Sequence, residues 1–311
     1  MKKKGNVNRR DFLKKGVAVG AAAFGVRILS RSDHLFAQVE NNQFPDLVAV
    51  RNGEPDVMFE AAMKTMGGMR RYVKKGQTVV VKPNIGWARE PENGADTNPL
   101  LVKKVVEHCI EAGAKQVYVF DNSCNNWKEC YSLSGISEAA KNAGAKVVPG
   151  NSEKYYEEVQ IDDAKVLKKT MVHELILESD VFINIPVLKH HSGTKMTAAM
   201  KNLMGVVWNR WYYHKSGLDE CISDFCLYKK PDLNIIDAYR ITTDNGPQRA
   251  RPEDIILKKM LLMSEDIVAV DTAASKILFP DSDAIEHVRL GFNKNIGNNK
   301  LQDLNIKKIA L

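Results

Sequence analysis

Residues 78–84 read Thr-Val-Val-Val-Lys-Pro-Asn, and residues 181–191 read Val-Phe-Ile-Asn-Ile-Pro-Val-Leu-Lys-His-His. Each stretch begins with a short, continuous apolar run, which is typical of a strand in a sheet covered on both faces. Sheets of that kind consist of parallel strands joined by helices, because parallel neighbours need a long crossover connection. The two stretches therefore predict an α/β fold.

The sequence on either side continues the alternation of apolar runs and amphipathic stretches. Further strands are predicted at 47–50, 116–120, 146–148, 233–236, 257–263 and 304–311. Helices are predicted at 57–73, 99–112, 136–143, 197–207, 218–228 and 267–278. Residues 149–180 are expected to hold a small antiparallel insertion. The expected fold is a three-layer, Rossmann-like α/β domain with a mostly parallel sheet, which forms a single domain over residues 38–311.

The net charge of the chain is concentrated near its start. The 311 residues carry +7, from 45 Lys and Arg against 38 Asp and Glu. Nine of the basic residues and two of the acidic ones lie in residues 1–37, which leaves 36 of each sign in residues 38–311. A neutral domain lacks the surplus of positive charge that nucleic-acid binding needs. The charge distribution therefore argues against a nucleic-acid partner.

Residues 1–37 have the layout of a twin-arginine signal peptide. The segment Asn-Arg-Arg-Asp-Phe-Leu-Lys at 8–14 precedes an uncharged run over 16–26, and Ala37 precedes the expected cleavage point. The uncharged run has 11 residues, whereas a transmembrane helix needs about 20. No permanent membrane span is therefore expected, and only a retained leader would act as an anchor. The sequence predicts a periplasmic or otherwise extracytoplasmic protein, exported folded by the twin-arginine translocase.

Polar side chains follow several of the predicted strands at their carboxyl ends. In an open parallel sheet, ligands bind beyond that edge. The residues there supply ammonium, amide and carboxylate groups, which predict a site for a small anionic ligand. The expected substrate-binding residues are Lys82, Asn84, Asp121, Thr197 and Asn202.

Residues 189–202 are the strongest candidate for chemistry. A predicted loop with Lys189, His190 and His191 leads into the helix expected from residue 197, and Lys201 lies one turn inside that helix. The free N–H groups of the helix N-terminus would favour an anion, and the lysines would add positive charge. His191 is expected to carry a proton near neutral pH, so the catalytic candidates are His191, Lys201 and Lys189. His190 and His191 are also candidate metal ligands, and a solvated loop with ordinary helix capping is the alternative.

Residues 208–214 read Trp-Asn-Arg-Trp-Tyr-Tyr-His and follow that stretch directly. Four aromatic rings together with Arg210 and His214 suit a lid over the site, which would stack on a ring-bearing ligand. An aromatic cluster at the edge of the core is the alternative.

Five cysteines follow the leader, and none of them forms a Cys-x-x-Cys pair. That spacing excludes ferredoxin-type and zinc-ribbon modules. An odd number leaves at least one thiol free or paired outside the chain. The pairing of the others is left open.

Four blocks of the sequence resemble the family called domain of unknown function 362. They cover most of residues 47–280 and comprise 76–86, then 96–121, then 186–191 with 197–205, and finally Asp237, 245–247 and 266–271. Some relatives are described as iron–sulfur proteins, but this chain has no ferredoxin-type cysteine run. A fainter similarity is to the amino-terminal domain of nickel-pincer lactate racemases, in which a His and a Lys fall where His191 and Lys201 stand.

Three functions remain open at this point. The first is an exported enzyme acting on a small anionic substrate, with or without a metal or organic cofactor. In it, Lys82, Lys189 and Lys201 would hold the anion and His191 would move the proton. The second is a periplasmic iron–sulfur or other metal-binding redox protein. The third is a non-catalytic ligand-binding protein.

Overall fold

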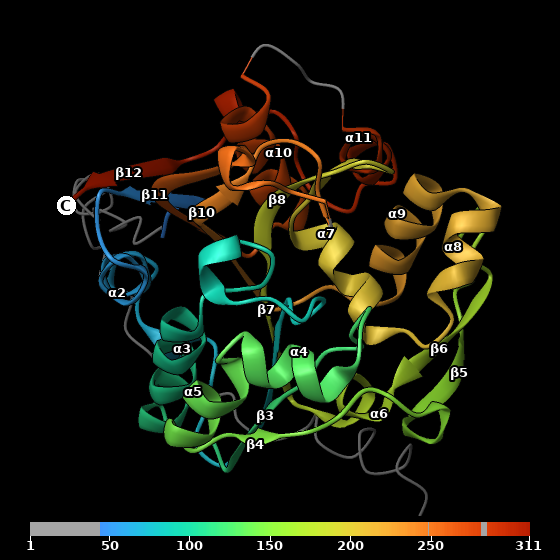
Figure 1. Cartoon of the computed structure of the whole chain (residues 1–311), viewed down its shortest axis with the longest axis horizontal. Helices are drawn as coiled ribbons and strands as arrows, with labels where there is room; N and C mark the ends of the chain where they lie inside the picture. Colours follow the sequence, from blue (N-terminus) through green and yellow to red (C-terminus); the bar gives the residue numbers. More distant parts are fainter. Residues whose placement is uncertain (1–43, 248, 281–284) are drawn as a thin grey trace, which may run out of the picture. The chain divides into compact units, whose positions relative to one another are not determined.

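The central sheet of the computed structural model is mostly parallel, as the apolar runs predict. Along the sheet the strands follow the order β12-β1-β11-β10-β7-β2-β3-β4, and β11 alone on this path runs antiparallel to its neighbours (Figure 1). These strands are β1 (Leu47–Arg51), β2 (Thr78–Pro83), β3 (Gln116–Val119), β4 (Lys146–Val147), β7 (Val181–Ile185), β10 (Leu233–Thr242), β11 (Ile255–Ser264) and β12 (Ile306–Ala310).

The structure describes residues 44–247, 249–280 and 285–311. Residues Phe44–Leu311 form one compact unit. The predicted leader, residues 1–37, lies outside the described residues.

Helices cover both faces of the sheet and complete three layers. Side chains alternate along β2, so Val79 and Val81 face one hydrophobic core while Val80 faces another. The first core includes residues of α2 (Pro55–Thr65), α3 (Pro99–Glu111), α4 (Trp127–Leu133) and α5 (Ile136–Asn142). The second includes residues of α6 (Glu174–Glu178), α7 (Ala199–Asn202), α8 (Arg210–Ser216), α9 (Leu218–Tyr228), α10 (Ile267–Leu278) and α11 (Glu286–Asn293). The three-layer α/β prediction is confirmed.

Most of the predicted helices lie where the periodicity placed them. Those at 99–112, 136–143, 218–228 and 267–278 correspond to α3, α5, α9 and α10, to within one residue at either end. The helix predicted at 57–73 ends earlier, at Thr65, because Gly67 and Gly68 both adopt positive φ, which a continuing helix cannot accommodate. The expected antiparallel insertion is present as β5 (Tyr156–Gln160) and β6 (Lys169–His173).

The stretch between β7 and α8 differs from the prediction. Residues 187–191 form β8 (Val187–His191) rather than a loop, and β8 turns back into β9 (Lys195–Thr197). The helix expected over 197–207 is reduced to the four residues of α7, followed by a 3₁₀ turn at Leu203–Val206. A helix of one turn cannot supply the N-terminal anion site that a longer helix offers.

The N-terminus of α7 is already occupied by a carboxylate. Asp271, on α10, accepts hydrogen bonds from the backbone N–H of Ala199 at 2.6 Å and of Met200 at 2.9 Å. Burial raises the pKa of Asp271 to about 7, and the same two N–H donors oppose that shift. The expectation that free N–H groups at this helix end would receive an anionic ligand is therefore wrong.

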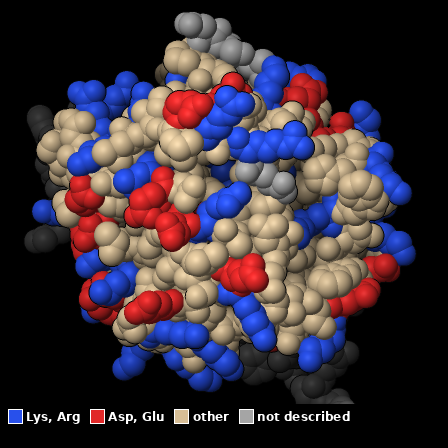
Figure 2. Space-filling model, viewed as in Figure 1, with Lys and Arg blue, Asp and Glu red and all other residues tan. Residues whose placement is uncertain are grey.

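Positive and negative side chains are interspersed over the face of the molecule seen in Figure 2. This distribution agrees with the equal numbers of basic and acidic residues after the leader. Within the part of the chain that the structure describes, no helix has both the length and the apolar character needed to span a bilayer.

Replacing Asp271 by Ala is expected to lower the free energy of unfolding by roughly 2–5 kcal/mol, since two buried N–H donors lose their acceptors. Asp271→Asn keeps one acceptor oxygen and should lose less. Urea titrations of the three proteins followed by circular dichroism give the comparison. Wild-type stability in the Ala variant would show that the cap is dispensable.

Candidate functional site

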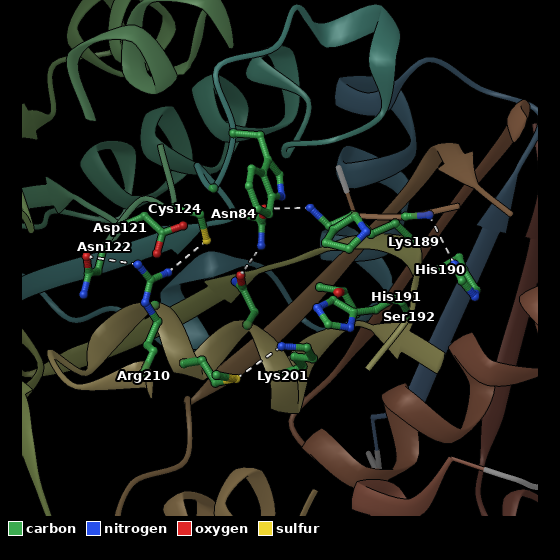
Figure 3. A pocket seen from close by; sticks show the side chains of 18 of the residues that line it. Asn84, Asp121, Asn122, Cys124, Lys189, His190, His191, Ser192, Lys201 and Arg210 are labelled. Carbon is green, nitrogen blue, oxygen red and sulfur yellow. Dashed lines mark hydrogen bonds between the residues drawn. The ribbon is translucent and has the colours of Figure 1, made fainter. Parts of the chain in front are cut away.

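A cavity of about 720 Å³ opens beyond the carboxyl ends of β2 and β3. Side chains from β8, β9, α7 and α8 and from the loop after β10 complete its wall (Figure 3). The cavity is lined by every residue that the sequence singled out for the site: Lys82, Asn84, Asp121, Lys189, His190, His191, Thr197, Lys201 and Asn202. The structure thus brings together residues that lie up to 120 positions apart in the chain.

A buried ion pair forms the floor of the cavity. Lys82 Nζ lies 2.8 Å from Asp121 Oδ1, and both side chains are almost completely shielded from solvent. Lys82 also donates to Asn202 Oδ1 at 2.9 Å and to the Pro83 carbonyl at 2.7 Å. Burial lowers the pKa of Lys82, and the neighbouring carboxylate opposes that shift. Because protein atoms accept the hydrogen bonds of Lys82 Nζ, we assign this residue a structural role in the site rather than a role in ligand binding.

Lys189 is also held by oxygen atoms of the protein. Its Nζ donates to Asn84 Oδ1 at 3.1 Å and to the backbone carbonyl of Ala95. Asn84 in turn donates to Asn202 Oδ1 at 3.0 Å, which links Lys189 to the ion pair below. Burial lowers the pKa of Lys189, while the carboxylate of Asp96 works in the opposite direction.

Lys201 differs from the other two buried lysines. Its side chain is 8% exposed, and within the described residues its hydrogen-bond partner is the thioether sulfur of Met204, at 3.2 Å. A thioether is a weak acceptor, so the ammonium has little to replace its hydration. Burial is the main cause that lowers the pKa of Lys201 to about 8; the positive charges of Lys189 and Arg210 act in the same direction, and Cys124 and Asp219 oppose them. The Lys201 side chain therefore exists as both amine and ammonium near physiological pH.

His191 is a neutral hydrogen-bond donor. Its pKa falls to about 2, chiefly because of burial and then because of the charges on Lys201 and Lys189. Its Nδ1 accepts a hydrogen bond from the Gly193 N–H at 3.0 Å, so the single ring proton resides on Nε2. The expectation that His191 titrates near neutral pH is not met, because an imidazolium in this positive environment is strongly disfavoured.

His190 and His191 do not combine into a metal site with other residues of the described chain. Both rings line the cavity, but the Nδ1 of each already accepts a backbone hydrogen bond, from the Gly246 N–H at 3.2 Å for His190 and from the Gly193 N–H at 3.0 Å for His191. Among residues 44–247, 249–280 and 285–311, no group of three His, Cys, Asp or Glu side chains is placed to hold a metal ion. The cysteines of this region are free thiols, four of them buried and Cys124 exposed. These residues do not fit an iron–sulfur cluster.

The sequence places Arg210 in the expected lid, but it does not predict which residues the Arg210 guanidinium contacts. Its guanidinium donates to the Ser123 carbonyl at 2.8 Å and contacts Cys124 Sγ at 3.1 Å. Figure 3 shows Arg210 on the side of the cavity occupied by Asp121 and Cys124, across from His191. The only hint in the sequence is its position two residues after Trp208, in the segment expected to form a lid.

Residues 208–214, which were expected to form an aromatic lid, contribute Arg210 and His214 to the cavity, whereas Trp211, Tyr212 and Tyr213 do not line it. Tyr213 is buried in the core, whereas Trp211 and Tyr212 are exposed to solvent. Part of the aromatic cluster thus belongs to the core, as the alternative interpretation held.

The charged residues around the cavity give it a positive potential. Five basic residues line it (Lys82, Lys189, Lys201, Arg210 and Arg249), against two acidic ones (Asp121 and Asp244). Asp121 is already neutralised by Lys82. A cavity with this balance favours an anionic ligand.

Gly205 leaves the space in which the ion pair sits. A Cβ atom at this position would overlap Asp121 Oδ1 and would lie 2.6 Å from Lys82 Nζ. Gly205→Ala is therefore expected to destabilise the protein by about 1–3 kcal/mol, or to displace the pair. Gly86→Ala is the matched control, because its nearest new contact is the Asn84 side chain at 3.3 Å. Equal melting temperatures for the two variants would contradict this account.

Comparison with known proteins places the chain among relatives of limited similarity. It is 27% identical over 243 residues to a thylakoid-associated protein of Synechocystis sp., with 74% of this chain and 73% of that protein covered. A solved structure from Thermotoga maritima gives a TM-score of 0.48 at 11% identity, covering 73% of this chain and 60% of that one. The lactate racemase apoprotein from Thermoanaerobacterium thermosaccharolyticum gives 0.43 at 11% identity, covering 68% and 53%. This chain thus spans less than two thirds of either solved chain.

The resemblance of the four sequence blocks to domain of unknown function 362 is confirmed. The family model described as domain of unknown function, DUF362, matches residues 79–276, which is more than half of the chain and includes all the site residues predicted from the sequence. The chain belongs to the DUF362 family.

Proposed function

We propose that this DUF362 protein is an enzyme that binds a small anionic substrate in the cavity at the carboxyl edge of its sheet. The observation that carries the proposal is the uncompensated positive charge there. Lys201 has a thioether as its partner among the described residues, and the side-chain contacts of Arg210 are with neutral acceptors and a thiol. An anion would supply the negatively charged partner that the contacts of these two cations within the described residues do not include.

Different groups in the cavity are suited to different tasks. Lys201 and Arg210 would bind the anionic group. His191, neutral and protonated on Nε2, would donate a hydrogen bond to a substrate oxygen. Lys82, Asn84 and Asn202 would hold the frame through their mutual contacts.

Lys201 is the residue best suited to move a proton. A group with a pKa of about 8 is present in both protonation states near neutral pH, which is the condition for general acid–base work. His191, whose pKa is about 2, would act as a fixed donor beside it. In this proposal the proton-transfer role expected of His191 passes to Lys201.

Anion affinity should fall as the pH rises through about 8, because Lys201 loses the charge that attracts the ligand. Calorimetric titration with succinate and with inorganic phosphate, from pH 6.5 to 9.5, measures this dependence. Lys201→Met should weaken binding about 10-fold to 100-fold at pH 7, the loss of one charge-assisted hydrogen bond. Lys201→Arg should retain binding but lose the step near pH 8.

Lys215→Met is the control for that titration, because Lys215 is an exposed lysine on α8 that does not line the cavity. It should bind both anions as the wild type does. Unchanged affinity in Lys201→Met would refute the assignment of the anion site. Tight binding without turnover of any tested acid would favour a ligand-binding protein instead.

We also propose that the protein is exported by the twin-arginine route, and this part of the proposal rests only on the sequence of residues 8–37. Expressed with its leader, the wild-type chain should be found in the periplasm and shortened to begin at Gln38. The double substitution Arg9→Lys and Arg10→Lys should leave it full-length in the cytoplasm, whereas Lys2→Arg with Lys3→Arg should not. Immunoblots of fractionated cells distinguish these results, and equal export of the first double variant would contradict this route.

A further inference from the structure

The surroundings of Lys201 stabilise its ammonium form less than water does, so a larger fraction of the side chain is neutral than for an exposed lysine. Its Nζ contacts a sulfur atom, while the nearby Lys82 and Lys189 each have two or more oxygen partners. Burial disfavours the ammonium form most; the charges of Lys189 and Arg210 add to that effect, and Cys124 and Asp219 oppose it. A lysine that is desolvated and placed near other cations is activated as a nucleophile.

The same cavity would hold an anion next to that amine. Arg210 lines the wall with a guanidinium that no described carboxylate pairs with, and a planar guanidinium matches the two oxygens of a carboxylate. A carbonyl group is the electrophile with which an amine reacts without oxidant, metal or activated co-substrate. A carboxylate and a carbonyl on adjacent carbons define a 2-oxo acid.

We propose that Lys201 forms a Schiff base with the carbonyl carbon of a 2-oxo acid whose carboxylate is bound by Arg210. The inference rests on the proposed function and names its substrate class. The volume of about 720 Å³ leaves ample room for an acid of this size.

The covalent step balances without any other reactant. The lone pair of the neutral Lys201 amine forms a C–N bond to the carbonyl carbon, and the C=O π electrons move to oxygen. One N–H proton passes to that oxygen, giving a carbinolamine. The second N–H proton follows as the C–O bond breaks, so that one water leaves and a C=N bond remains. No atom is oxidised or reduced.

His191 has a positioning role in this step. Its Nε2–H is the proton left over after Nδ1 accepts from Gly193, so it can donate to the developing carbinolamine oxygen. It cannot compete with that oxygen for a proton, because its pKa is about 2. Lys201 is thus the group that reacts, and His191 stabilises negative charge as it forms.

Reductive trapping tests the proposal directly. The purified protein is incubated with pyruvate or 2-oxoglutarate and sodium cyanoborohydride, and then analysed by intact mass and peptide mapping. The expected product is a single secondary amine on Lys201, with a mass gain equal to that of the acid less one oxygen. Lactate and 2-hydroxyglutarate, which lack the carbonyl, should give no product.

Lys201→Arg should give no product while keeping its circular dichroism spectrum. Lys215→Met should be trapped as the wild type is. The rate of trapping should rise through about pH 8 as the amine fraction grows.

The outcomes separate this inference from the proposed function. If the protein binds pyruvate and succinate but yields no adduct, the Schiff base is refuted and the anion site stands. Modification spread over exposed lysines, with Lys201 no faster than the rest, refutes it equally. If neither acid binds at all, both proposals fail.

Discussion

Lys82 is the next-to-last residue of β2, and Asp121 follows the parallel strand β3. Their ion pair connects the two strands at the edge of the sheet where the cavity opens. Removing two charges from water is costly, and a buried pair recovers that cost only when its remaining hydrogen bonds are satisfied. Here Lys82 donates to Asn202 and to the Pro83 carbonyl, and Asp121 Oδ2 accepts from the N–H of Ile85, while the contact of Asp121 Oδ1 is the ion pair itself. The absence of a side chain at residue 205 makes the space. The cavity exists in its present shape because these contacts are all made at once.

The three buried lysines of the cavity differ in the atoms that accept their hydrogen bonds. Lys82 has a carboxylate and Lys189 has two carbonyl oxygens, so each is held as part of the frame. Burial lowers the pKa of all three lysines, to about 8 for Lys201, but Lys201 has a thioether where the other two have oxygen acceptors. Residue type is the same in all three cases, so the difference in chemistry comes from the acceptors that surround each ammonium. This contrast is the physical basis for assigning binding and reactivity to Lys201.

Much of the fold and the membership of the site could be predicted from the sequence, because both follow from short-range patterns. The run at 78–81 gives a doubly covered strand, and the polar residues after each such strand share one edge. The rest depends on contacts across long separations. Asp271 caps the N-terminus of α7 although it lies 72 residues further along the chain, and Arg210 contacts Cys124, which precedes it by 86 residues. The tautomer of His191 depends on a turn that periodicity does not show. Such contacts determine the protonation state and the hydrogen-bond partners of each site residue, and they cannot be predicted from a local sequence pattern.

The strand order places β12 beside β1, the last described strand against the first. Until residues 306–310 have been synthesised, β1 is the edge of the sheet, with an unpaired ladder facing solvent or another chain. Closure of that edge therefore requires a strand that lies some 260 residues after β1 in the chain. A nascent chain of this topology cannot finish its sheet early, whatever the order in which its interior strands assemble. Any route that handles the protein only in its folded form must wait for residues 306–310.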